Sequence, residues 1–127
     1  MPKNFLLSTI GQIALTVQKL ERAVEFYRDK LGLKHLFTVP NMAFFDCDGV
    51  RLMLGLPEGM AAGKNNSVIY FKVADIHQAA EMLTKRGVKF ESKPHLIAKM
   101  ETHDLWMGFF RDPDNNLLSI MSEMPKQ

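Results

Sequence analysis

The residue types best suited to chemistry lie in one short polar segment near the C-terminal end, T-H-D-L-W at 102–106. A histidine beside a carboxylate can act as a general base, because the unperturbed pKa of histidine lies near neutral pH. His103 precedes Asp104 here and is the candidate catalytic residue. Trp106, the only tryptophan, offers a wide stacking surface and one hydrogen-bond donor. The alternatives are a solvated loop for His103 and core packing for Trp106.

Composition limits the partners that such residues can serve. The 127 residues make one domain, and 16 basic against 14 acidic residues leave a formal charge of +2. This balance, without a basic run, argues against nucleic acid. The single cysteine, Cys47, excludes an internal disulfide and favours a reducing compartment. The N-terminal apolar run is too short for a signal peptide or a membrane span, so we expect a cytoplasmic protein without a membrane partner.

The elements that must position these residues form a pattern that occurs twice. A strand-like alternation at 10–17 is followed by apolar residues at helical spacing over 20–31, and the pattern returns 56 residues later, where Ile69 matches Ile13. Asp75 with Gln78 predicts the start of the second helix. The remaining extended segments are predicted at 33–39, 42–46, 51–56, 67–73, 89–90, 94–100, 106–110 and 117–121. Residues 57–66 are the predicted linker, and 101–105 a polar loop.

The strands predict a sheet with two different faces. One parity is wholly apolar, as in Ile13, Leu15 and Val17, and should lie under the helices. The other parity is mixed, and we call it the mixed face; its members are Gln12, Ala14, Thr16, Arg51, Met53, Gly55, Val68, Tyr70, Lys72, Leu117, Ser119 and Met121. Two mixed faces curved toward each other would form a small-molecule cleft, and the alternative is flat packing against another subunit. In each of the pairs Phe44/Phe45 and Phe109/Phe110, one ring should face the helices; the pattern leaves open which.

Three segments carry a resemblance to a known family: I-G-Q-I-A-L-T-V at 10–17, F-Y-R-D-K-L-G-L at 26–33, and G-F-F-R-D-P-D-N-N-L-L-S-I-M at 108–121. The chain resembles the vicinal oxygen chelate superfamily, which includes glyoxalase I, extradiol dioxygenases, methylmalonyl-CoA epimerase and the bleomycin- and fosfomycin-resistance proteins. The resemblance implies an α+β fold in which two βαβββ modules, about 8–56 and 67–122, form one cupped eight-stranded mixed sheet with helices on one face. It also implies a single domain over 1–127 and a homodimer.

Activity in this superfamily usually depends on a divalent metal. The resemblance carries its four ligand positions to Gln12, Met53, Val68 and Ser119, where metal-using relatives typically have His or Gln, Glu, His and Glu. Only Gln12 suits such a cation, because a thioether, an isopropyl group and a hydroxyl are poor or impossible ligands for it. We therefore expect no metal and no other cofactor, as in the bleomycin-resistance members.

The resulting hypothesis is a protein that binds an unidentified small, partly apolar molecule in a cleft. The candidate ligand-binding residues are Gln12, Phe44, Met53, Val68, Tyr70, His103, Trp106, Ser119 and Met121. One alternative is a metal-independent lyase or isomerase that uses His103 as general base. Another is a metal-dependent glyoxalase or dioxygenase relative with unusual ligands. The sequence leaves open whether the modules pair within one chain or between two chains.

Overall fold

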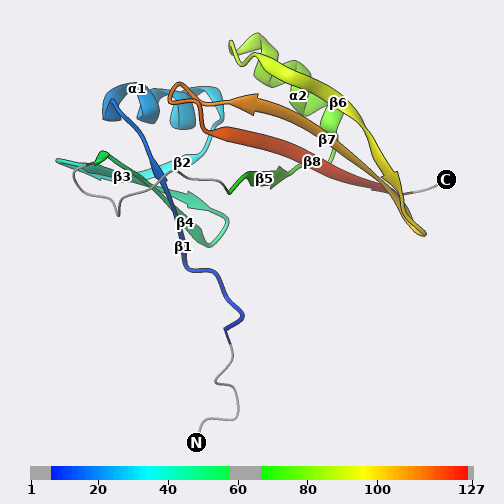
Figure 1. Ribbon diagram of the computed structural model, residues 1–127, viewed down its shortest axis with the longest axis horizontal. Helices are drawn as coiled ribbons and strands as arrows, with labels where there is room; N and C mark the ends of the chain where they lie inside the picture. Colours follow the sequence, from blue (N-terminus) through cyan, green and yellow to red (C-terminus); the bar gives the residue numbers. More distant parts are fainter. Residues whose placement is uncertain (1–6, 58–66, 126–127) are drawn as a thin grey trace, which may run out of the picture.

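Two modules of the same βαβββ order make up the fold. The computed structural model describes residues 7–57 and 67–125 and has two four-stranded sheets, with strand orders β1-β4-β3-β2 and β5-β8-β7-β6 (Figure 1). The elements are β1 (Gln12–Thr16), α1 (Leu20–Glu25), the π-helix η1 (Phe26–Lys30), β2 (Lys34–Val39), β3 (Met42–Cys47), β4 (Val50–Gly55), β5 (Ile69–Lys72), α2 (Ile76–Lys85), β6 (Phe90–Lys99), β7 (His103–Arg111) and β8 (Leu117–Pro125). The predicted α+β class and the eight strands are confirmed. The predicted linker, except Pro57, lies outside the described residues.

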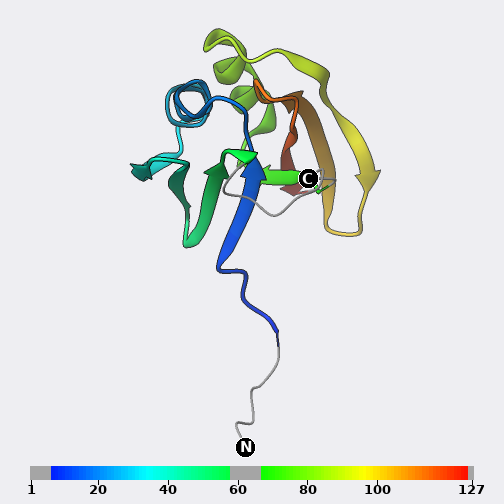
Figure 2. The same cartoon turned by 60° about the vertical axis from the view of Figure 1, so that its left-hand side comes forward.

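Each sheet is mixed in the same way. The first strand runs parallel to the last, as β1 does with β4 and β5 with β8, while the other neighbours are antiparallel. Both helices lie toward the same side of the sheets in two views of the molecule (Figures 1 and 2). No helix in the described parts of the chain is long and apolar enough to cross a membrane.

The apolar parity of the strands forms the core beneath the helices. Phe45 and Phe110 are fully buried there, so Phe44 and Phe109 belong to the mixed faces. One hydrophobic cluster contains residues of both modules. The ring of Phe26 lies 6.5 Å from that of Phe110. In each of the two phenylalanine pairs, the second ring therefore faces the helices, which the sequence left open.

One local prediction is refined and another was wrong. The predicted helix over 20–31 is present, but after Glu25 it widens into η1, where the Leu31 amide donates to the Phe26 carbonyl. The wider turn accompanies the burial of two consecutive aromatic rings, Phe26 and Tyr27, which pack against different strands. The segment 101–105 is not a loop, because β7 already begins at His103. A strand can carry polar side chains on both of its faces, so the polar sequence at 101–105 does not by itself indicate a loop.

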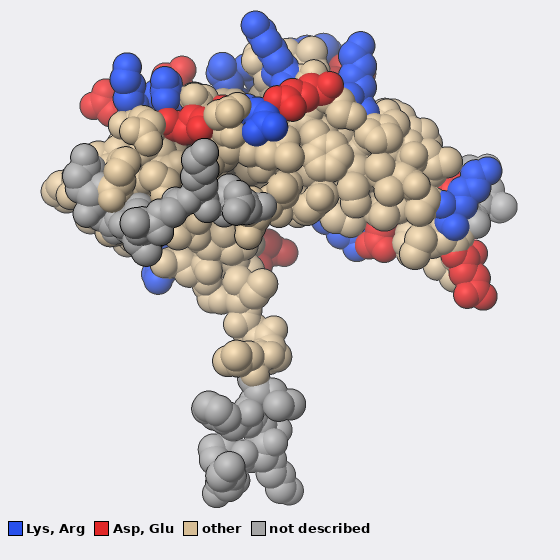
Figure 3. Space-filling model, viewed as in Figure 1, with Lys and Arg blue, Asp and Glu red and all other residues tan. Residues whose placement is uncertain are grey.

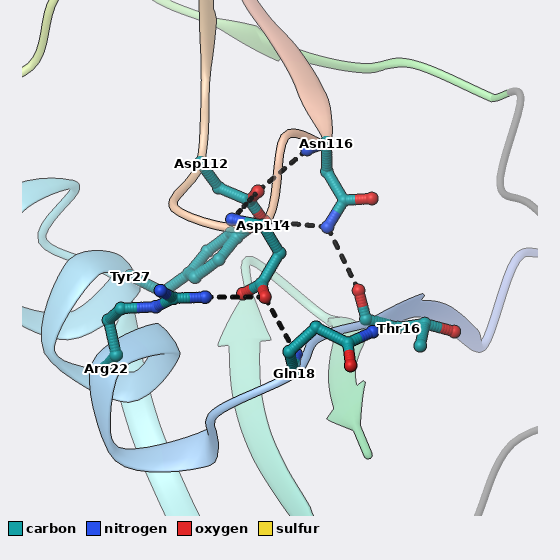
Figure 4. Close-up of polar contacts among 7 residues, drawn as sticks. All are labelled: Thr16, Gln18, Arg22, Tyr27, Asp112, Asp114 and Asn116. Carbon is teal, nitrogen blue, oxygen red and sulfur yellow. Dashed lines mark hydrogen bonds and ion pairs between the residues drawn. The ribbon is translucent and has the colours of Figure 1, made fainter. Parts of the chain in front are cut away.

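The turn between β7 and β8 joins the second module to the first (Figure 4). The buried carboxylate of Asp112 accepts hydrogen bonds from the Tyr27 hydroxyl at 2.7 Å, the Asp114 amide at 2.9 Å, and the amide and side chain of Asn116, both at 2.8 Å. The Asn116 side chain also donates to the Thr16 carbonyl at 3.1 Å. In the structure, therefore, this turn ties together two modules of one chain.

A second carboxylate of the turn fixes the start of α1. Asp114 Oδ1 accepts from the Gln18 amide and from the Arg22 guanidinium, each at 2.8 Å (Figure 4). Asn115 has φ of 69°, which suits asparagine better than most residues. The D-P-D-N-N sequence thus supplies both the acceptors and the backbone geometry of this junction.

Candidate functional site

The mixed face of the first module carries an arginine held in a fixed position. Arg51 lies directly across from Gln12 in the parallel β1–β4 pair, and its Nε donates to Gln12 Oε1 at 2.7 Å. The guanidinium carbon lies 5.4 Å from the ring centroid of Phe44, which itself lies 4.6 Å from that of Phe37. The Gln12 amide is in turn 3.8 Å from the Met53 sulfur. Charge, amide and aromatic surface therefore occur together on this face.

The mixed face of the second module is covered by an aromatic pair. Tyr70 on β5 and Phe109 on β7 flank Ser119 on the strand between them, and their ring centroids are 5.9 Å apart at 81°. Strands two apart in a sheet are separated by about 9.5 Å, so the two rings lean toward each other over Ser119. This explains why Ser119 is fully buried while Tyr70 is 44% exposed.

Ser119 does not offer its hydroxyl to the surface. The oxygen lies 2.9 Å from the Gly108 carbonyl and 3.1 Å from the Ile120 carbonyl, and its hydrogen is directed at the backbone. The predicted ligand contact through this hydroxyl conflicts with its complete burial. Met121 lies next to Lys72 on the same face and is half-buried, and Val68 is half-buried just before β5 begins.

The dyad expected from sequence is divided between the two faces. His103 lies on the mixed face and Asp104, its neighbour in a strand, on the other. The carboxylate partner of His103 is instead Glu123, whose Oε2 lies 2.9 Å from His103 Nε2. Lys72 Nζ lies 2.9 Å from the other oxygen of Glu123, and its hydrogen bond and charge lower the pKa of Glu123 from its ordinary value. A histidine, a carboxylate and an ammonium group therefore form a chain across β7, β8 and β5.

Trp106 lies on the opposite face from these residues. It pairs with Leu96 and Ser122 in the sheet, and its ring centroid is 5.0 Å from that of His77 on α2. The core-packing alternative therefore describes Trp106 better than a place on the mixed face.

Sequence reasoning missed two residues of this arrangement. Arg51 was assigned to the mixed face without a role, although the pairing of first and last strands brings it opposite Gln12. Glu123 lies beyond the predicted end of the last strand at 121, because β8 continues to Pro125. Glu123 follows Ser119 and Met121 at intervals of two residues and therefore lies on the same face of the sheet. This is apparent from the sequence only if the last strand is extended beyond residue 121.

A cavity borders the mixed face at the junction of the modules. Its volume is about 610 Å³, and it lies between the β3–β4 hairpin and β5, with Tyr70 and Lys72 among its lining residues. Gln12, Phe44 and Met53 do not line this cavity or four others within the described residues. Gln12 and Arg51 are exposed, so this part of the first module's mixed face is open in a single chain.

Comparison with known families agrees with this architecture. The family model described as "Glyoxalase/Bleomycin resistance protein/Dioxygenase superfamily" matches residues 9–120, which is nearly the whole chain. The chain belongs to this superfamily. The resemblance noted in the sequence is therefore confirmed.

Proteins with similar sequence or structure come from several bacteria. The chain is 32% identical over 123 residues to the uncharacterized protein YraH of Bacillus subtilis, covering 86% of this chain and 94% of YraH. A superfamily structure from Sphaerobacter thermophilus is 26% identical with a TM-score of 0.75, over 92% of this chain and 98% of that one. Lactoylglutathione lyase from Agrobacterium tumefaciens has a TM-score of 0.75 at 22% identity, covering 91% and 93%, which shows a shared fold alone.

The side chains at the four positions carried over from the superfamily are poorly suited to binding a divalent metal ion. Gln12 already receives a guanidinium proton, and a cation beside Arg51 would be repelled by it. Met53 and Val68 bring no hard donor, and the Ser119 hydroxyl is turned toward backbone carbonyls. Within residues 7–57 and 67–125, no three His, Cys, Asp or Glu side chains gather in a way that could hold a metal ion. The Arg51 guanidinium beside these side chains suits an electron-rich ligand group better than a cation.

Proposed function

We propose that the chain binds a small, partly apolar organic molecule on its mixed faces, without a resident metal ion. The observation that carries this proposal is the guanidinium of Arg51, held by Gln12 and stacked on Phe44 where metal-using superfamily members place ligands. A fixed guanidinium recognises carboxylate or carbonyl oxygen, and the adjacent ring offers a stacking surface.

The ligand's chemical class follows from the neighbours of Arg51. No carboxylate of the described residues lies within ion-pair distance of its guanidinium. Its Nε is used by Gln12, so the terminal nitrogens remain for an acceptor on the ligand. With Phe37, Phe44 and Met53 on the same face, the ligand has an aromatic or otherwise apolar body and at least one acceptor group.

The proposal includes a homodimer, because the first module's mixed face is open in one chain. A second copy could cover it and bring the Tyr70–Phe109 pair of its own mixed face opposite Arg51. Sedimentation velocity at micromolar concentration should show a dimer, and a monomer at that concentration would contradict this part of the proposal.

The metal question has a direct test. Protein expressed with supplementary nickel, zinc, manganese and iron, and purified without chelators or affinity metal, should contain far less than one metal ion per chain by elemental analysis. Stoichiometric metal would contradict metal-free binding. The glyoxalase or dioxygenase chemistry with unusual ligands would then become the leading explanation.

The binding surface can be tested with 8-anilinonaphthalene-1-sulfonate, an aromatic anion whose fluorescence rises in apolar surroundings. Saturable binding by the wild type should weaken in Phe44→Ala and in Arg51→Gln. Ile97→Ala removes an exposed apolar side chain of β6 and is the matched control, for which we expect wild-type binding. If Phe44→Ala and Arg51→Gln both bind the probe as the wild type does, the proposed surface is wrong.

A second candidate function is a metal-independent lyase or isomerase with His103 as general base. The 2.9 Å contact between His103 Nε2 and Glu123 favours it, because a carboxylate that holds one ring nitrogen fixes the ring's orientation. The other nitrogen, Nδ1, lies 3.2 Å from the Thr102 hydroxyl, and a substrate would take the place of that contact. Once a substrate is found by activity screening, His103→Ala should abolish turnover and Glu123→Gln should reduce it. Full turnover by His103→Ala would exclude this mechanism.

A further inference from the structure

An apolar cavity lies on the helix-covered side, away from the mixed faces. Its volume is about 240 Å³, and it is formed where α2 passes over β5 and β8 and meets the end of the first module's helix. Leu33 contributes from the first module, while Phe71, Ala79, Met82 and Phe110 contribute from the second. A cavity of about 150 Å³ with apolar walls takes up benzene, so this one can hold a phenyl ring or a short alkyl chain.

The cavity has one polar lining residue, Arg86. Arg86 follows α2 directly, is exposed, and donates from Nη1 to the Lys30 carbonyl at a long 3.3 Å. Among the residues that the structure describes, neither Arg86 nor Lys30 has an ion-pair partner. The rim of the cavity therefore carries positive charge that no carboxylate of the described chain neutralises.

A purely structural role would be for Arg86 to cap the carbonyl at the end of η1. That contact occupies one of the five N–H groups of the guanidinium and leaves the others for an anion. A capping role also gives no reason for an apolar cavity of about 240 Å³ beside the guanidinium. Figure 3 shows basic and acidic side chains together along the upper edge of the molecule, over the helices. The anion preference therefore rests on the Arg86 guanidinium beside the apolar lining, and an amphipathic anion matches these two features.

We infer that this cavity is a second ligand site, which takes a small carboxylic acid with an alkyl or aryl body. The apolar body lies against Phe71, Ala79 and Phe110, and the carboxylate accepts hydrogen bonds from Arg86 at the rim. The site is separate from the mixed face, because it opens beside α2 and shares no residue with the Gln12–Arg51–Phe44 group. It does not depend on the function proposed above.

Calorimetric titration with octanoate and with octan-1-ol tests the inference. Octanoate also suits the ligand class proposed for the mixed face, so all titrations use an Arg51→Gln background. This parent protein should bind one octanoate per chain and prefer it over octan-1-ol. Adding Arg86→Gln should weaken octanoate binding by about tenfold or more and leave octan-1-ol binding unchanged. Adding Lys85→Gln instead, one residue earlier at the end of α2, removes the same charge outside the cavity and should leave octanoate binding as in the parent.

Filling the cavity provides an independent test. Ala79→Phe should abolish binding of both compounds, and Ala79→Met is the smaller replacement if the phenylalanine variant fails to fold. Octanoate binding that persists in the Arg51→Gln background and is lost when Arg86 or Ala79 is replaced separates this site from the mixed face. The inference is overturned if the Arg51→Gln protein does not bind octanoate, binds octan-1-ol equally well, or binds octanoate as tightly when Arg86 or Ala79 is also replaced.

Discussion

The Tyr27–Asp112 hydrogen bond allows the junction between the modules to be tested quantitatively. The hydroxyl of Tyr27 is buried and donates at 2.7 Å to a carboxylate that is 5% exposed. A hydrogen bond to a charged group contributes about 1.5–3 kcal/mol to stability. Tyr27→Phe leaves Asp112 with three other donors, so we expect a loss of about 2 kcal/mol, toward the lower part of that range. For a chain of this length, the melting temperature should fall by about 6 °C.

Urea unfolding followed by circular dichroism measures this loss. Asp112→Ala should cost more, about 4 kcal/mol, because it leaves the Tyr27 hydroxyl and two turn amides without their acceptor. Arg28→Gln removes an exposed pair with Asp29 and serves as the control, with no measurable change. If Tyr27→Phe is as stable as the wild type, the turn does not hold the modules together in the way argued above.

The same hydrogen bond predicts a dependence on alkaline pH. Burial first, and then the charge and hydrogen bond of Asp112, raise the pKa of Tyr27 above the ordinary value of about 10. Above that pH the unfolded chain releases the phenolic proton while the folded chain keeps it. Stability is therefore complete below about pH 10 and falls as the pH rises further. Tyr27→Phe lacks this contribution, so the stability difference between the two proteins should shrink above pH 10.

Three further changes test other parts of the fold. Gly108→Ala would place a Cβ 3.2 Å from the Pro94 nitrogen, and the forced shift of β6 should cost about 1–3 kcal/mol in urea unfolding. Asp75→Ala removes the side chain that accepts from the third residue of α2, and should cost about 1 kcal/mol by the same measurement. Lys72→Gln should raise the pKa of Glu123 toward its ordinary value in an NMR titration of the carboxyl carbon, and an unchanged midpoint would contradict the assigned cause.

Most of the architecture followed from two kinds of sequence pattern. The period of two in the strands separated Leu15, Leu52 and Leu118 on the helix side from the mixed face, and the duplication placed the second helix and the last strand. Both patterns depend on local chemistry repeated over several residues. The Asp75 cap is as predicted, because its acceptor needs only a neighbour three residues away.

The parts that could not be predicted depend on pairing across the sheet. Which carboxylate meets His103 is decided by the length of β8, since Glu123 reaches it only after that strand passes residue 121. The hydrogen-bond partner of Gln12 is Arg51, because the parallel register of β1 and β4 places the two residues opposite each other. A linear motif such as His103-Asp104 suggests a dyad, but alternation in a strand turns adjacent side chains to opposite faces.

The separation of the two faces also explains why family membership leaves the reaction open. Side chains on the helix side are buried or packed against the buried core and carry the stability, whereas Gln12, Arg51 and Tyr70 are exposed. Replacing exposed side chains usually changes stability little, so this face can exchange one ligand set for another without loss of the fold. Met53 and Val68, where relatives hold metal ligands, are consistent with such an exchange. The guanidinium of Arg51 then supplies fixed positive charge on a surface that keeps the superfamily's geometry. Under the function proposed above, the next question is which electron-rich group that charge receives.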